Sequence, residues 1–210
     1  MITRRQIPNL LTFARVLAVP ACLLLMLSPI AHTPQWLLGI FIAAALTDFL
    51  DGYLARKWQV ISPLGTMLDP IADKLLVALM LMYLLTIAGT QLLLPVIIIL
   101  LRELYISGLR EFLASRRITL PVSKTGKLKT ATQMLAVTTL LTQYAMDPPG
   151  QINFPCKLVQ RASELTTSCI NQPWLLQAAK SAGLPLLYIA ALLAFVSAAA
   201  YTLASWKHVR

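Results

Sequence analysis

The chain has 210 residues, of which 58% are hydrophobic and only 12% charged, and its 18 basic and 8 acidic residues give a formal net charge of +10. Soluble domains carry about a quarter charged residues, so this composition excludes a soluble globular protein and indicates an integral membrane protein. Six spanning helices of ~20 residues each leave no room for a large soluble domain. We therefore expect a single membrane-embedded domain over residues 1–210.

Apolar runs along the chain predict an all-α bundle of six transmembrane helices, because a chain in lipid must satisfy its backbone hydrogen bonds within each segment. A short interfacial helix is expected over residues 2–9, turning into the first span at Pro8. A cleaved signal peptide is the alternative for this start, and Arg15 within the apolar run disfavours it. The expected spans are residues 10–29, 35–57, 69–88, 92–114, 128–146 and 183–206.

Basic residues are distributed unequally between the two sides of this topology. Fifteen of the 18 fall on the side of the termini or at that end of a span, and three fall in the connection over residues 147–182. The positive-inside rule then places both termini in the cytoplasm, in a multi-pass protein of the cytoplasmic (inner) membrane. Most of these charges are expected to fix topology and attract anionic lipid headgroups, with no nucleic-acid partner. The outward connection holds Cys156 and Cys169, either as a disulfide or as two free thiols.

Four of the eight acidic residues stand at the predicted cytoplasmic ends of the second and third spans. Asp48 and Asp51 are three residues apart, so they share one helix face. Asp69 and Asp73 are four apart and share a face of the next helix, which a short turn over residues 59–65 allows to meet the first.

Grouped carboxylates at a membrane boundary are costly unless cations neutralise them. Hard divalent cations prefer oxygen ligands, and two such ions can clamp an in-line phosphoryl displacement. The acids therefore predict a two-ion site for phosphoryl transfer. Two alternatives remain: a salt-bridged cluster in which Asp69 caps the third span, followed by Pro70, and a transporter that moves a metal ion.

Glycine, alanine and arginine residues at set distances complete the acidic pattern. The stretch reads Asp48-x2-Asp51-Gly52-x2-Ala55-Arg56-x8-Gly65-x3-Asp69-x3-Asp73. All eight fixed positions match the signature of the CDP-alcohol phosphotransferase family, which the chain resembles over roughly residues 5–145. The resemblance implies a six-helix membrane enzyme, usually a homodimer, with its site open to the cytoplasm. Such enzymes transfer a phosphatidyl or similar group from a CDP-linked donor to an alcohol and release CMP.

The resemblance also implies roles for individual residues. It makes the four aspartates ligands of two Mg²⁺ or Mn²⁺ ions, and it assigns Asp73 as the general base. It places the nucleotide and pyrophosphate pocket at Gly52, Ala55, Arg56 and Gly65. The ions would neutralise the pyrophosphate, and Arg56 would add a fixed cation beside the same phosphates.

Three further segments, residues 7–15, 102–111 and 122–134, resemble the phosphatidylglycerophosphate synthases within this family. That resemblance implies CDP-diacylglycerol as the donor and sn-glycerol 3-phosphate as the acceptor. A cardiolipin synthase of the same fold is the alternative, followed by an inositol-type or serine-type enzyme. An acceptor with a phosphate group needs cations of its own. The expected acceptor-site residues are Arg102, Arg110, Lys124, Lys127, Lys129, Asn9 and Arg15.

Overall fold

The computed structural model describes five stretches of the chain, residues 6–28, 32–58, 63–118, 124–146 and 174–209. Side chains are described for residues 10–28, 32–48, 67–118, 126, 128–146 and 182–206. These stretches form six long α-helices and one short 3-10 helix, and they contain no strand. The helices are α1 (Gln6–Leu27), α2 (Thr33–Trp58), α3 (Pro63–Ala88), η1 (Thr90–Leu92), α4 (Leu93–Ser115), α5 (Lys124–Met146) and α8 (Trp174–Val209).

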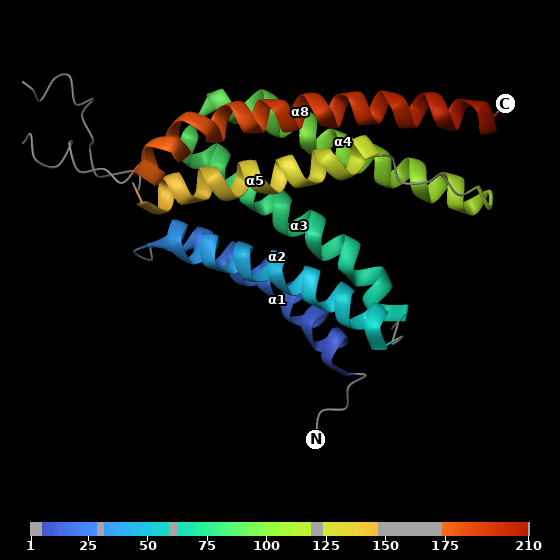
Figure 1. Ribbon diagram of the computed structural model, residues 1–210, viewed down its shortest axis with the longest axis horizontal. Helices are drawn as coiled ribbons and strands as arrows, with labels where there is room; N and C mark the ends of the chain where they lie inside the picture. Colours follow the sequence, from blue (N-terminus) through green and yellow to red (C-terminus); the bar gives the residue numbers. More distant parts are fainter. Residues whose placement is uncertain (1–5, 29–31, 59–62, 119–123, 147–173, 210) are drawn as a thin grey trace, which may run out of the picture.

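Successive helices run in opposite directions, so the bundle is antiparallel in chain order (Figure 1). α8 packs along both α5 and α4, whereas α1 lies against α2 and α3. α2 also contacts α5, and α3 contacts both α4 and α5, so these contacts join the two groups of helices. The start of α1, the end of α2 and the start of α3 lie toward the same end of the molecule as the ends of α4 and α8 (Figure 1).

Four helical stretches in the described part of the chain are long and apolar enough to cross a membrane. They are Leu10–Leu27, Met67–Ala88, Thr90–Ser115 and Ala182–Trp206, and they match the first, third, fourth and sixth predicted spans. α2 and α5 are helices where the other two spans are expected, and their crossing of the membrane stays a prediction. α5 is rich in threonine, and hydroxyls such as that of Thr138 donate to a carbonyl one turn back, which satisfies them inside the helix.

Apolar side chains cover the outside of the bundle as well as filling its centre. Phe41 and Met80 are completely or almost completely buried, whereas Leu24, Leu104 and Leu203 are 65–73% exposed. A water-soluble bundle presents polar residues on its outer surface. The apolar exterior therefore supports a multi-pass membrane protein.

The helix boundaries near the acidic residues differ from the predicted ones. α1 passes through Pro8 without the expected turn, because a proline in the first turn of a helix loses no intrahelical hydrogen bond. Residues 2–5 of the expected interfacial helix lie outside the described residues. α3 already begins at Pro63, a position that suits the fixed φ of proline. Gly65 is therefore helical rather than part of a turn, and Asp69 lies inside the helix rather than at its cap.

The long connection predicted over residues 147–182 ends earlier than expected, because α8 begins at Trp174. Cys156 and Cys169 lie outside the described residues. Cys22, on α1, is a buried free thiol.

Near the start of the predicted sixth span, α8 approaches α5 closely: a Cβ atom at Gly183 would lie 2.8 Å from Leu140 Cδ2. Glycine at this position therefore allows the two helices to pack as they do.

Candidate active site

Three of the four predicted acidic ligands converge on one arginine side chain. Arg15 Nη1 lies 3.1 Å from Asp48 Oδ1, 3.5 Å from Asp69 Oδ1 and 3.2 Å from Asp73 Oδ1. The four-residue spacing places Asp69 and Asp73 on one face of α3, while Asp48 comes from α2. Because α1 lies against both of these helices, Arg15 reaches all three carboxylates from a third direction.

The arginine and the carboxylates of this cluster differ in exposure. The Arg15 side chain is 1% exposed, whereas those of Asp48, Asp69 and Asp73 are 50%, 34% and 42% exposed. The guanidinium therefore approaches from the interior of the bundle, and the carboxylates keep an open side. Three carboxylates and one guanidinium leave a net negative charge among these four groups, so the cluster attracts a further cation.

The donor set of this cluster fits a hard divalent cation, because it offers only oxygen atoms and a net negative charge. Within the described residues, no group of three or more His, Cys, Asp or Glu side chains is placed to hold a metal ion. The three carboxylate oxygens lie 3.1–3.5 Å from Arg15 Nη1, whereas the oxygen ligands of Mg²⁺ lie ~2.0–2.1 Å from the ion. An ion at the position of this nitrogen would need the three oxygens to move inward by about 1 Å.

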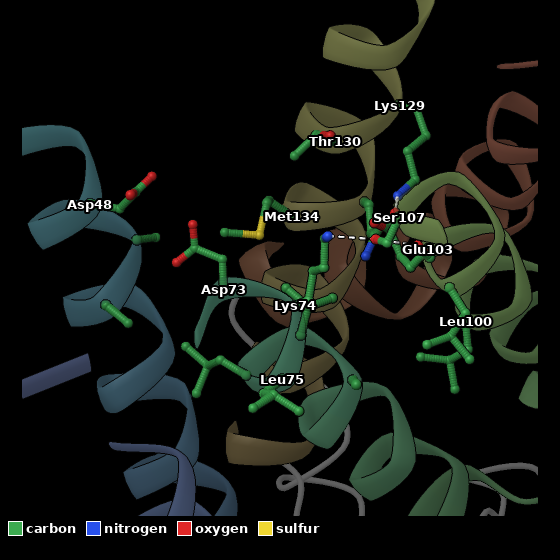
Figure 2. A pocket seen from close by; sticks show the side chains of 17 residues that line it. Asp48, Asp73, Lys74, Leu75, Leu100, Glu103, Ser107, Lys129, Thr130 and Met134 are labelled. Atoms are coloured by element: carbon green, nitrogen blue, oxygen red, sulfur yellow. Dashed lines mark hydrogen bonds and ion pairs between the residues drawn. The ribbon is translucent and has the colours of Figure 1, made fainter. Parts of the chain in front are cut away.

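A cavity of about 360 Å³ adjoins the aspartates. Asp48 and Asp73 face it from one side, and Lys74, Glu103 and Lys129 line the other (Figure 2). Its apolar walls include Leu75, Leu100, Leu104 and Met134. A cavity lined by both charged groups and apolar side chains suits a ligand that is itself part polar and part apolar.

The two lysines that line this cavity, Lys74 and Lys129, contact polar groups of α4. Lys74 Nζ donates to Ser107 Oγ at 2.5 Å, and the Ser107 hydroxyl donates to the carbonyl oxygen of Glu103 at 2.7 Å. Lys129, which is buried, forms an ion pair with Glu103 Oε1 (Figure 2). Arg102 Nη1 lies 3.2 Å from the same carboxylate oxygen. Glu103 thereby connects α4 to α5 beside the cavity.

Sequence reasoning did not predict Glu103, Ser107 or Lys74 as parts of the site. The available signal was a glutamate next to an arginine inside an apolar helix, because ionisable groups in such segments need partners. The serine one turn further along α4 adds a polar group on the same face.

Two predicted acceptor residues on α4 contact α8 instead of the cavity. Arg102 Nε donates to Ser197 Oγ at 3.1 Å, and Arg110 Nη2 donates to Tyr201 Oη at 3.0 Å. The Arg110 guanidinium also lies 5.3 Å from the centroid of the Tyr201 ring. Neither arginine lines the cavity, whereas Lys129 does. The structure thus places Lys129 at the cavity and holds Arg102 and Arg110 against α8.

The remaining predicted site residues have side chains outside the described set. Their backbone positions lie on helices, at the start of α1, the end of α2, the start of α3 and the start of α5. They are Asn9, Asp51, Gly52, Ala55, Arg56, Gly65, Lys124 and Lys127.

Comparison with known proteins decides the family. The model of the CDP-alcohol phosphatidyltransferase family matches residues 5–206, almost the whole chain. The chain belongs to this family. The resemblance inferred from the aspartate signature is thereby confirmed.

The curated relatives that resemble this chain include proteins of two names. A protein of Cereibacter sphaeroides named CDP-diacylglycerol–glycerol-3-phosphate 3-phosphatidyltransferase is 47% identical over an alignment of 140 positions, which covers 64% of this chain and 62% of that protein. A protein of the same name from Rickettsia bellii is 45% identical over 138 residues, or 65% of this chain and 75% of the relative. A protein of Oryza sativa subsp. japonica named cardiolipin synthase (CMP-forming) is 38% identical over an alignment of 216 positions, which covers 96% of this chain and 57% of that protein.

Proposed function

We propose that this chain transfers the phosphatidyl group of CDP-diacylglycerol to sn-glycerol 3-phosphate, giving phosphatidylglycerophosphate and CMP. The observation that carries the proposal is the convergence of Asp48, Asp69 and Asp73 beside a cavity lined by charged groups and apolar side chains. The family match and the names of the two bacterial relatives support the same reaction. In this reaction the acceptor hydroxyl oxygen bonds to the phosphatidyl phosphorus, and the bond from that phosphorus to CMP breaks.

Each residue of the signature has a proposed part in this transfer. Two Mg²⁺ or Mn²⁺ ions held by Asp48, Asp51, Asp69 and Asp73 would neutralise the pyrophosphate and stabilise CMP as the leaving group. Asp73 accepts the proton of the acceptor hydroxyl, which requires a hydrogen bond between the two groups. The proposed nucleotide and pyrophosphate residues are Gly52, Ala55, Arg56 and Gly65.

The acceptor phosphate is proposed to bind at the lysine side of the cavity. Lys74 and Lys129 line that side, opposite the carboxylates, so a small anionic acceptor placed between them has its hydroxyl directed toward Asp73. Lys124 and Lys127 precede Lys129 on α5 and add positive charge. Arg102, Arg110, Asn9 and Arg15 complete the proposed set. To reach the acceptor, Arg102 and Arg110 would have to leave their partners on α8, and Arg15 would have to leave the three carboxylates.

The proposal places this reaction in one membrane-embedded domain over residues 1–210. The active site and both termini are on the cytoplasmic side of the inner membrane, as the distribution of basic residues favours. The functional unit is a homodimer, in line with the resemblance of the chain to its family.

An acceptor panel tests the proposed reaction. The full chain, purified in detergent micelles with CDP-diacylglycerol and Mg²⁺, is given glycerol 3-phosphate, phosphatidylglycerol, inositol or serine, and released CMP is measured. We expect release with glycerol 3-phosphate, loss of release in EDTA, and recovery on adding Mg²⁺ or Mn²⁺. Release only with inositol or serine, or undiminished release in EDTA, would contradict the proposal.

A cardiolipin synthase is the second candidate, because the rice protein of that name aligns with 96% of this chain. The same carboxylates would serve the hydroxyl of phosphatidylglycerol in place of that of glycerol 3-phosphate. The panel separates the two candidates directly. CMP release with phosphatidylglycerol and none with glycerol 3-phosphate would establish the second.

A further inference from the structure

Arg15 is a buried cation that touches three of the proposed ion ligands. It comes from α1, whereas the acidic signature lies entirely on α2 and α3. Its Nη1 atom lies within 3.5 Å of carboxylate oxygens of Asp48, Asp69 and Asp73. These oxygens are therefore within about 7 Å of one another, close enough to repel strongly in a partly buried setting.

The position of the guanidinium matters as much as its charge. A single nitrogen occupies the point on which the three oxygens converge, which is also the region where a cation shared by these carboxylates would bind. A guanidinium and a divalent ion repel each other at such short range. The same arginine therefore stabilises the carboxylates before an ion binds and competes with the ion that replaces it.

We propose that Arg15 is a positioning residue that serves as an internal counter-ion, holding the carboxylates of Asp48, Asp69 and Asp73 together until divalent ions bind and then giving way to them. The inference rests on the proposed function only in its use of divalent ions. It assigns no acceptor and no chemical step to Arg15. Its consequence is thermodynamic: removing the positive charge destabilises the ion-free protein more than the ion-loaded protein.

The linkage between stability and ion binding makes this consequence measurable. A ligand stabilises a folded state according to its affinity. A variant that loses more stability in the ion-free protein than in the ion-loaded protein must therefore bind the ions more tightly. For Arg15→Gln we expect the dissociation constant for Mn²⁺ to fall by roughly three- to tenfold. We also expect the thermal midpoint to fall by several degrees in EDTA and to recover most of that loss in saturating Mn²⁺.

The experiment uses Mn²⁺ alone as the probe, with the full chain in detergent micelles and no substrate. Free Mn²⁺ is counted by electron paramagnetic resonance to give the dissociation constant, and thermal unfolding is recorded in EDTA and in Mn²⁺. Arg102→Gln is the matched control, because Arg102 is a mostly buried arginine paired with a different carboxylate, that of Glu103. Its midpoint should fall equally with and without Mn²⁺. An equal fall for Arg15→Gln, or weaker Mn²⁺ binding, overturns the proposal.

Arg15→Lys keeps the test decisive if the glutamine variant does not fold. It retains the charge without the planar guanidinium, so in EDTA it should lose less stability than a variant without the charge. Its loss of stability in Mn²⁺ should be smaller than its own loss in EDTA. Equal losses in both conditions overturn the proposal. A wild-type chain that binds no Mn²⁺ overturns both this inference and the ions of the proposed function. A chain that binds Mn²⁺ but does not use glycerol 3-phosphate refutes only the proposed acceptor, and the unfolding data still decide the role of Arg15.

Discussion

Asp69 illustrates what a single carboxylate contributes to the site. Its Oδ1 atom lies 3.5 Å from Arg15 Nη1, the atom that Asp48 and Asp73 also contact. Changing Asp69 to Asn keeps the shape but removes the charge, so we expect CMP release to fall by at least on the order of 100-fold. The measurement is the rate of CMP release with glycerol 3-phosphate and saturating Mg²⁺.

Glu111→Gln is the control for Asp69→Asn, since Glu111 is an exposed acid on α4. It should retain activity within about twofold, as expected for a surface charge away from the ions. An Asp69→Asn variant that is folded and as active as this control would remove Asp69 from the proposed ion site.

The spacing of the aspartates was predictable at the residue scale, but the partner they share was not. The separation of Asp69 from Asp73 is local information, because the helix repeat alone fixes which residues share a face. The convergence of Arg15 on the same point depends on how α1 packs against α2 and α3, which no local pattern encodes. The sequence still carried a signal, since an arginine inside an apolar run needs an acidic partner.

At the scale of elements, one ion pair connects α4 and α5 beside the cavity. The side chains of Glu103 and Lys129 are 21% and 2% exposed. Changing Glu103 to Gln leaves the buried ammonium of Lys129 without its carboxylate, so we expect a loss of about 3 kcal/mol in the free energy of unfolding. The measurement is reversible unfolding of the full chain in mixed micelles.

A double variant distinguishes the loss of this ion pair from a general packing defect. Glu103→Gln together with Lys129→Met removes both charges, so it should recover most of the lost stability. A double variant as unstable as the sum of the two single variants would show that the pair is not coupled.

For the molecule as a whole, composition was enough to predict an all-helical membrane bundle, because lipid leaves few ways to satisfy a backbone. The sequence does not predict which helices pack against one another, for a related reason. Helices that are apolar on every side lack the periodic pattern that marks a buried face in a soluble protein. Ile99 and Leu104 are both apolar residues of α4, yet the first is fully buried and the second 73% exposed. Only the packing of α4 against its neighbours separates them.

The orientation of the bundle in the membrane gives the last prediction, and α4 is the helix suited to testing it. Thr90 precedes α4 and Ser115 ends it, and both are exposed at opposite ends of a stretch long enough to cross a membrane. If the termini are cytoplasmic, the antiparallel order of the helices places Thr90 outside and Ser115 inside. In a chain whose three native cysteines are replaced by alanine, a membrane-impermeant maleimide added to intact bacterial spheroplasts should label Thr90→Cys, and it should label Ser115→Cys only after the membrane is permeabilised. The opposite pattern would place the proposed active site on the outer face of the membrane, where a cytoplasmic CDP-linked donor could not reach it.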